Sequence, residues 1–239
     1  MLRRIAVVAA LVALTLAWTS PAQAGSTADL TIARMTAHYR DPGLEVQNKP
    51  FALLYLRTTE GMRAANAGGE FSDPAFWDSE VIPTFAGYYL DAYAAWQRGD
   101  AADVPPAWRI AFQARVGRLT CSQLLYLGIN AHVNNDLAFV IEDLGQRYTY
   151  ADHRHVDTVL VDRVAPVVYP EIQRVLCPDL FTDPVPATAD RDITAWRQLA
   201  WDNARRLQQA PDERTRRAVA RQIRQHARDK AREILRWGR

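Results

Sequence analysis

Hydrophobic and polar residues follow a helical spacing along almost the whole chain. Apolar side chains recur every three or four residues in successive segments, which is typical of α-helices that bury one face. No segment shows the sustained alternation of apolar and polar residues that a half-buried β-strand requires. The pattern therefore predicts an all-α fold, a multi-helix bundle of about seven to nine helices.

Glycine, proline and capping residues predict where these helices begin and end. Gly68 closes one helix, Asp73 caps a short one, and Asp152 is expected to cap another, which Pro166 should kink. The proline-bearing stretch at residues 178–189 is expected to be an extended connector. The main expected helices cover residues 28–40, 49–67, 82–98, 107–119, 122–144, 152–176, 190–209 and 212–237.

The first 24 residues have the features of a cleaved signal peptide. Arg3 and Arg4 precede an apolar stretch too short for a comfortable membrane span, and residues 22–24 provide a small-x-small cleavage site. We therefore expect residues 1–24 to be removed and residues 25–239 to form a single helical domain. The mature protein is expected to be secreted or to lie in the cell envelope.

Charge is unevenly distributed, although the chain holds 29 Lys or Arg against 27 Asp or Glu. Residues 205–239 contain 12 of the basic and 4 of the acidic residues. Their helical spacing predicts a basic amphipathic helix over about residues 212–237, with an apolar face that packs on the domain. The basic face is expected to be solvated, and the alternatives are contact with an anionic cell-envelope lipid or with a polyanion. Export and the lack of a nucleic-acid-binding motif argue against nucleic acid as a partner.

Cys121 and Cys177 are the only two cysteines. If the helices at residues 122–144 and 152–176 form an antiparallel pair, both cysteines lie at its open end, about equally far from the turn. An exported chain meets an oxidising environment, so the two residues are predicted to form a disulfide. Two buried free thiols are the alternative.

The most informative segment is residues 124–144, where polar residues interrupt an otherwise apolar helix. Burying such groups costs about 1–3 kcal/mol each unless they are paired. His132 and Asp136 share one helix face, and Gly128, one turn earlier, is expected to leave room for a ligand above the imidazole. The remaining polar residues of the run are candidate ligand-binding residues: Asn130, Asn134 and Asn135.

The His132–Asp136 pair is compatible with three chemical roles. The two side chains can bind a divalent metal ion such as zinc, or Asp136 can orient His132 as a general base. The third role is a hydrogen-bonded network that ties neighbouring helices together. Asp91, the single charge of an aromatic helix, is the candidate third partner of this pair, with an arginine-paired structural acid as its alternative. His155 and Asp157 are further candidates for the same cavity.

The run Gly128-Ile-Asn-Ala-His-Val-Asn-Asn-Asp-Leu137 resembles the core motif of a bacterial helical family known as domain of unknown function 5995. The resemblance implies an all-helical fold. It implies no particular activity, because the family has no established one. Other segments that share the resemblance are residues 71–74, 85–92, 108–112, 152–156 and 195–201.

Three functions are compatible with these features. We expect, in first place, a hydrolase, metal-assisted or metal-free, with His132, Asp136 and Asp91 as catalytic residues. An ordinary serine hydrolase is disfavoured because the Gly-x-Ser-x-Gly motif is absent. The second function is a non-catalytic cell-envelope protein that binds a small-molecule or lipid-like ligand, and the third is a purely structural helical domain. The aromatic wall of the binding pocket is predicted to consist of Tyr88, Tyr89, Tyr93 and Phe139.

Overall fold

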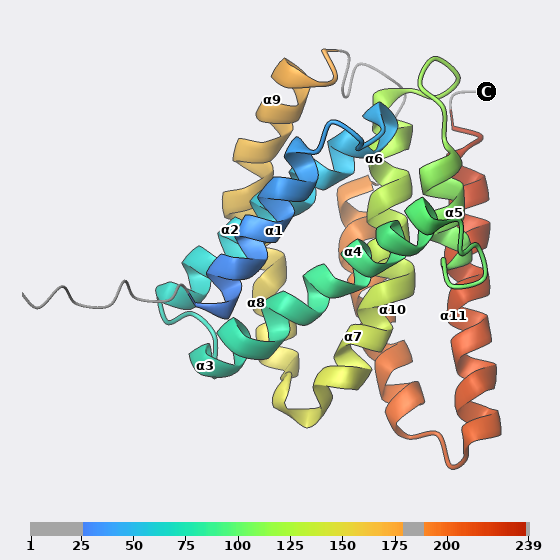
Figure 1. Cartoon of the computed structure of the whole chain (residues 1–239). Coiled ribbons are helices and arrows are strands. Elements are labelled where there is room, and N and C mark those ends of the chain that lie inside the picture. The colour runs from blue at the N-terminus through green and yellow to red at the C-terminus, as the bar shows by residue number, and fades with distance from the viewer. Residues whose placement is uncertain (1–25, 179–188, 238–239) are drawn as a thin grey trace, which may run out of the picture.

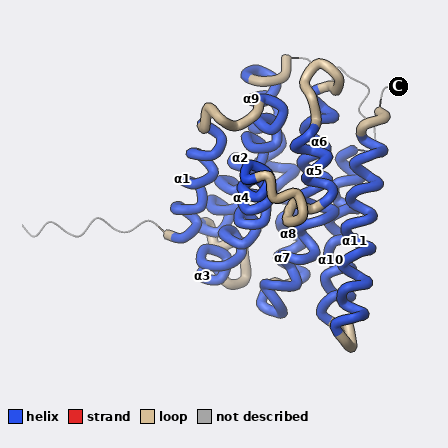
Figure 2. Tube along the Cα trace, turned by 45° about the vertical axis from the view of Figure 1, so that its right-hand side comes forward, coloured by secondary structure: helices blue, strands red, loops and turns tan. Residues whose placement is uncertain are grey.

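The computed structural model describes residues 26–178 and 189–237, and these residues fold into helices without a β-strand (Figures 1 and 2). The predicted all-α class is confirmed. Several labelled helices continue into one another, so the described chain forms 8 continuous helical rods. The predicted signal peptide and most of the predicted connector at residues 178–189 lie outside the described residues.

Most helix ends in the first half of the chain lie where the capping residues predict them. The Asp73 side chain accepts the backbone N–H of Phe76 at 3.0 Å, and Gly99 ends its helix with a left-handed φ of 78°. The helix expected at residues 107–119 is shorter than predicted, because extended backbone at Ala114 and a left-handed Gly117 form a turn. The elements are α1 (Thr27–Arg40), η1 (Val46–Asn48), α2 (Lys49–Ala67), α3 (Pro74–Phe76), η2 (Trp77–Val81), α4 (Ile82–Arg98) and α5 (Pro106–Gln113).

A central rod is formed by α6 (Cys121–Asn130), the π-helical turn η3 (Ala131–Asp136) and α7 (Leu137–Leu144). It lies in the middle of the molecule, with α2, α4 and α5 and the two C-terminal helices packed around it (Figure 1). Every residue from Ser122 to Asn130 is buried. A helix that is covered on all sides has to be apolar on all sides, which accounts for the composition of this segment.

A second long rod follows the turn η4 (Gly145–Arg147) and consists of α8 (Tyr150–Val159), the π-helical turn η5 (Leu160–Val164) and α9 (Ala165–Val175). The predicted cap of this rod is wrong by three residues: Thr149 is the N-cap and accepts the backbone N–H of Asp152 at 3.1 Å. The Asp152 carboxylate instead accepts the Ser72 hydroxyl at 2.5 Å, since it is buried against the loop that precedes α3.

A disulfide joins Cys121 to Cys177, as the sequence predicts. The Cα atoms are 5.9 Å apart, and the bridge connects the start of the central rod to the end of the second rod. The two rods are therefore tied together at both ends, by η4 and by the disulfide. Between these ends, α2 packs against both of them. A pair of helices that is held apart in this way encloses the cavity described below.

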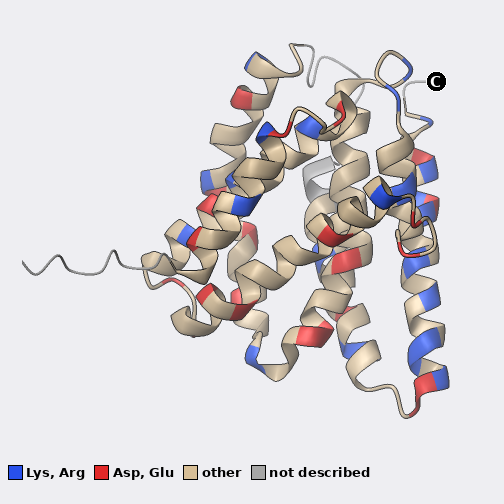
Figure 3. Ribbon diagram, in the orientation of Figure 1, with Lys and Arg blue, Asp and Glu red and all other residues tan. Residues whose placement is uncertain are grey.

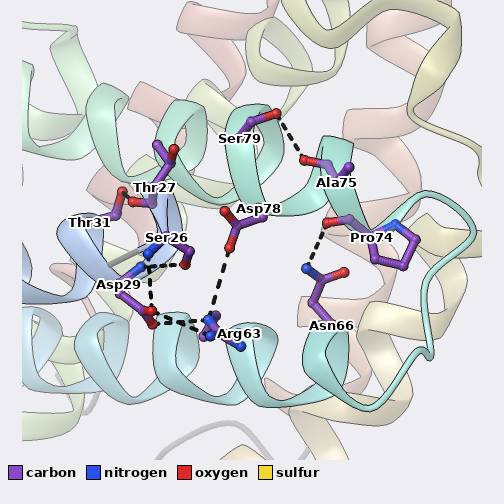
Figure 4. A network of polar contacts seen from close by, with 10 residues as sticks. All are labelled: Ser26, Thr27, Asp29, Thr31, Arg63, Asn66, Pro74, Ala75, Asp78 and Ser79. Atoms are coloured by element: carbon purple, nitrogen blue, oxygen red, sulfur yellow. Dashed lines mark hydrogen bonds and ion pairs between the residues drawn. The ribbon is translucent and has the colours of Figure 1, made fainter. Parts of the chain in front are cut away.

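Arg63 anchors α2 to its neighbours in the first half of the chain (Figure 4). Its Nε lies 3.0 Å from Asp29 of α1 and 4.0 Å from Asp78 of η2. Asp29 also forms a capping box with Ser26 at the start of α1. Because these groups are partly exposed, each ion pair contributes at most about 1 kcal/mol, and their main effect is to orient the helices.

The C-terminal helices α10 (Ala189–Gln208) and α11 (Glu213–Ile234) form an antiparallel hairpin against the central rod (Figure 1). The bounds of α11 agree with the predicted basic helix at about residues 212–237. Its apolar stripe is buried as predicted, with Val219, Ile223, Ala227, Ala231 and Ile234 facing the domain. Among the described residues, no helix combines the length and apolar character needed to cross a membrane.

Candidate functional site

The polar cluster predicted on the central helix lies in the π-helical turn η3. His132 Nδ1 is 3.3 Å from Asp136 Oδ2, and the same oxygen accepts the indole N–H of Trp108 at 2.8 Å. The other carboxylate oxygen of Asp136 accepts the side-chain amide of Asn135 at 2.7 Å. Asp136 is only 1% exposed, so three donors replace the water that an ionised carboxylate would otherwise bind.

These contacts determine which nitrogen of His132 is left to accept a further hydrogen bond. A carboxylate that already accepts from two other groups is a pure acceptor, so Nδ1 of the imidazole has to donate to it. Nε2 then carries the lone pair of the neutral ring. This atom is buried and has no hydrogen-bond partner among the residues that the structure describes.

His132 lines a cavity of about 550 Å³. The cavity lies between α2, the η2–α4 rod, η3, the α8–η5–α9 rod and the start of α10. The imidazole ring is 4.3 Å from the Tyr55 ring and 5.9 Å from those of Phe51 and Phe85, measured between ring centroids. The aromatic side chains that line the cavity around and beyond His132 are Phe51, Tyr55, Trp77, Phe85, Tyr148 and Tyr169.

Other parts of the wall are aliphatic. Met62 of α2 and the η5 residues Leu160 and Val164 contribute to them. Two further lining residues of this rod, Val161 and Pro166, are exposed, so the cavity reaches the surface beside η5. The three π-helical turns η2, η3 and η5 all contribute lining residues, which agrees with the frequent occurrence of such turns at functional sites.

Asp157 lines the same cavity, as one of the two further candidates predicts. It is paired with Arg197 of α10 at 2.5 Å and with Arg154 at 2.9 Å. The Arg197 guanidinium also donates to the backbone carbonyl of His153 at 2.8 Å. The other candidate, His155, contacts Glu70 at 2.9 Å and is not part of the cavity wall. The cavity therefore holds one ion pair, which is internally neutralised.

Asp91 is not brought to His132. Its side chain lies on the exposed face of α4, where water solvates it, and no hydrogen bond or ion pair joins it to the described residues. The helix places the aromatic residues around it on the buried faces, and the aspartate takes the face that no other helix covers. The predicted carboxylate–histidine–carboxylate cluster is thus reduced to a pair.

The three tyrosines of α4 that were predicted to line the pocket do not face the cavity, and their hydroxyl groups bond to other parts of the fold. The Tyr88 hydroxyl donates to Asp143 at 2.6 Å, and the Tyr93 hydroxyl donates to Glu45 at 2.6 Å. The Tyr89 hydroxyl pairs with His38 Nε2 at 2.7 Å. Phe139 of α7 is buried under the guanidinium of Arg224 of α11, 5.3 Å from its ring centroid. None of these four aromatic residues lines the cavity.

The asparagines of the cluster connect helices. Asn130 donates to the Ala227 carbonyl of α11 at 2.9 Å, and Asn134 donates to Asn130 Oδ1 at 2.9 Å. Asn135 supports Asp136, as described above. None of the three lines the cavity, so their predicted contact with a ligand is replaced by contacts within the fold.

Gly128 serves close packing rather than ligand access. A Cβ atom at this position would lie 2.4 Å from Cγ of Phe51, so the space above the glycine is filled by that ring. The prediction that a ligand occupies this space is wrong. The glycine nevertheless shapes the site, because it lets Phe51 of α2 approach the central rod and form part of the cavity wall.

The donor groups do not fit a metal centre. Within residues 26–178 and 189–237, no three His, Cys, Asp or Glu side chains converge in a way that could hold a metal ion. His132 and Asp136 bind each other, and both oxygens of Asp136 already accept hydrogen bonds. Zinc binding by this pair would require that network to be taken apart, so the pair does not fit the predicted metal site.

The cavity residues that the sequence did not single out come mostly from α2 and from the α8–η5–α9 rod. Phe51, Tyr55 and Met62 recur at helical spacing, and this spacing signals a buried face but not a cavity. Trp108 belongs to a segment of the family resemblance, although nothing in the sequence links it to Asp136. A hydrogen bond between residues 28 positions apart can only be found from the fold.

The basic face of α11 is exposed as predicted (Figure 3). Arg214 and Arg221 have no acidic partner among the described residues, whereas Arg216 pairs with Glu142 and Arg217 with Glu213. Contact of this face with an anionic lipid stays a prediction. The disulfide is compatible with an extracytoplasmic location.

His153, behind the Arg197 wall, predicts a loss of stability in mild acid. Burial, followed by the charge of Arg197, lowers the pKa of His153 from 6.5 to about 3. The unfolded chain then binds a proton that the folded chain does not bind, so the stabilisation is complete above pH 6.5 and is lost as the pH falls toward 3. Between pH 6.5 and about pH 5 we expect the free energy of unfolding to fall by roughly 1.5 kcal/mol.

Urea denaturation at several pH values measures this slope. The variant His153→Gln keeps a side-chain donor near the Arg197 carbonyl but cannot titrate, so its slope should be clearly smaller. Some slope should remain, because burial also lowers the pKa of His38. Equal slopes in the two proteins would show that His153 is not the group responsible.

The sequence profile of a family of unknown function, DUF5995, matches residues 28–237 of the chain. No curated protein and no solved structure matches the chain significantly.

Proposed function

The chain belongs to the family of unknown function DUF5995, and from this premise we propose that it binds an apolar small molecule in the His132 cavity. The observation that carries the proposal is the buried, unpartnered Nε2 of His132, a residue that lines that cavity. A polar atom that is withdrawn from water without a partner costs about 1–3 kcal/mol, and a ligand with a matching group would supply the partner.

The size and lining of the cavity support this proposal. A volume of about 550 Å³ lies within the range typical of small-molecule sites. Most of the lining side chains are aromatic or aliphatic, and the few polar groups are His132, three threonines, several tyrosines and the Asp157–Arg197 pair. Apolar walls with a small number of polar groups are the usual composition of such sites. A strongly charged ligand would find no free counter-charge on these walls.

A hydrolase remains the second candidate, and the Asp136–His132 dyad is the observation that favours it. A carboxylate that orients a histidine through Nδ1 and leaves Nε2 free is the arrangement of a general base. No serine, threonine or cysteine side chain is bonded to Nε2, so the nucleophile in this case would be water. Asp91 takes no part, because it lies outside the cavity.

Titration with the fluorescent apolar probe N-phenyl-1-naphthylamine tests the binding proposal. The wild-type protein should bind about one equivalent. The variant Ala165→Trp places a large ring on the cavity wall and should lose most of this binding. Val167→Trp is the matched control, because Val167 belongs to the same helix, is 62% exposed and does not line the cavity.

The outcomes separate the alternatives. Binding that survives in Ala165→Trp, or no binding in the wild type, would overturn the proposal, provided that circular dichroism shows both proteins folded. Hydrolysis of a medium-chain p-nitrophenyl ester, abolished in His132→Gln, would favour the hydrolase. Probe binding without any ester hydrolysis would leave the binding protein as the better description.

A further inference from the structure

We infer that the ligand of this cavity is an apolar alcohol whose hydroxyl group donates a hydrogen bond to Nε2 of His132. The inference rests on the proposed function and specifies the chemical class of its ligand. It follows from the hydrogen-bond direction at His132, from the charges on the cavity wall and from the distribution of aromatic and aliphatic side chains.

The direction of the hydrogen bond at Nε2 is determined by Asp136, which bonds to the other ring nitrogen of His132. Asp136 also accepts hydrogen bonds from Trp108 and Asn135, so it acts as an acceptor toward His132 as well, and Nδ1–H donates to it. In the neutral ring Nε2 is therefore the acceptor; it has no partner among the described residues, and its ring lines the cavity. A ligand group that only accepts hydrogen bonds, such as an ether or ester oxygen, would leave two lone pairs facing each other.

The charges on the wall disfavour an anionic ligand. Among the described lining residues, the one guanidinium is that of Arg197, and it is already bonded to Asp157 and to the carbonyl of His153. No lysine lines the cavity. A carboxylate or phosphate brought into this space would remain without a counter-ion, and the burial of an unpaired charge is strongly unfavourable. A neutral donor such as a hydroxyl group avoids this penalty.

The carbon part of the ligand is indicated by the remaining walls. The rings of Tyr55, Phe51 and Phe85 surround His132, so the atoms next to the hydroxyl group have to be apolar. Beyond them the wall becomes aliphatic and reaches the surface at Val161. A hydroxyl group at the head of a hydrocarbon chain or ring system fits this gradient.

A matched pair of ligands tests the inference. 1-Dodecanol and undecyl methyl ether have the same number of heavy atoms, but only the alcohol can donate a hydrogen bond. Displacement of N-phenyl-1-naphthylamine from the wild-type protein should require about tenfold less alcohol than ether, the upper end of what one net hydrogen bond contributes. Dodecanoate, which carries the charged group, should displace the probe least.

Two variants assign this preference to His132. In His132→Phe the alcohol should lose its advantage, while the ether should bind as it does to the wild type. In His132→Leu, which removes the imidazole without adding another ring, the two ligands should likewise bind about equally. Thermal denaturation of each variant establishes that it is folded, and the second variant keeps the test valid if the first does not fold.

Each result is decisive for one of the two proposals. If the probe does not bind to the wild type, the proposed function fails. If the probe binds but the ether displaces it as well as the alcohol does, binding stands and the inference fails. Tightest binding of dodecanoate would also overturn the inference, because it would require a protonated imidazole facing the cavity.

Discussion

Replacement of both cysteines, Cys121→Ala with Cys177→Ala, should lower the free energy of unfolding by about 4 kcal/mol relative to the oxidised protein. The bridge spans 56 residues, and in the chain-entropy model a loop of this length restricts the unfolded chain to about that extent. The bridge also ties the α8–η5–α9 rod to the central rod. Its loss should therefore weaken probe binding in the cavity as well as stability.

Chemical denaturation in urea, with and without reductant, measures the effect. The wild-type protein treated with dithiothreitol is the matched control, and it should unfold at nearly the same urea concentration as the double variant. The variant should also show a steeper dependence on urea, because an unfolded chain without the cross-link exposes more surface. A difference in stability below about 1 kcal/mol would contradict the prediction.

The second large effect is expected at the buried carboxylate. Asp136→Ala should lower the free energy of unfolding by about 3 kcal/mol, since it leaves the donors of Trp108, His132 and Asn135 buried without an acceptor. The imidazole would also lose the contact that fixes its orientation. Probe binding should consequently fall, although Asp136 itself does not line the cavity.

Asp136→Asn serves as the control for Asp136→Ala. The amide oxygen, in the place of Oδ2, can still accept from both Trp108 and His132, so only the hydrogen bond from Asn135 is lost and most of the network survives. We expect about half of the destabilisation or less. If the two variants lose equal stability in thermal and urea denaturation, the charge matters and the hydrogen bonds do not. If neither is destabilised, the cluster is not a structural support of the site.

The elements that the sequence predicted well are those with local causes. The starts and ends of α1, α2, α4 and α11 follow from caps, glycines and the spacing of apolar residues, all of which act within a few positions. The disulfide was also predictable, because two cysteines at the ends of one helical pair leave a single pairing. The His132–Asp136 contact belongs to the same class, since one helical turn brings the two side chains together.

The cavity could not be predicted because its wall is assembled from distant segments. Phe51, Phe85, Val164 and Arg197 come from four separate elements, and their convergence depends on how these helices cross. Asp91 illustrates the opposite error. Its aromatic neighbours suggested burial. Only some faces of α4 are covered by other helices, however, and the aspartate lies on the exposed face.

The sequence also gave no sign that three long helices contain π turns. In η2 and η5 a proline follows the turn within two residues, and its missing N–H releases a carbonyl of the preceding turn. No proline is present in η3, and nothing in the sequence explains its wider turn. A proline two residues beyond a helical segment is not specific enough to reveal a π turn without the structure.

Compared with a regular α-helix, the π turn η3 contains one extra residue, and the helix continues on both sides of it. Deletion of one residue there would restore a regular spiral and leave Leu137 and its successors facing α10 and the cavity as before. The same deletion in a regular part of the rod would rotate everything beyond it by about 100°. Alignments or designs that count positions along a uniform helix will therefore misassign the second half of this segment, even where every residue type agrees.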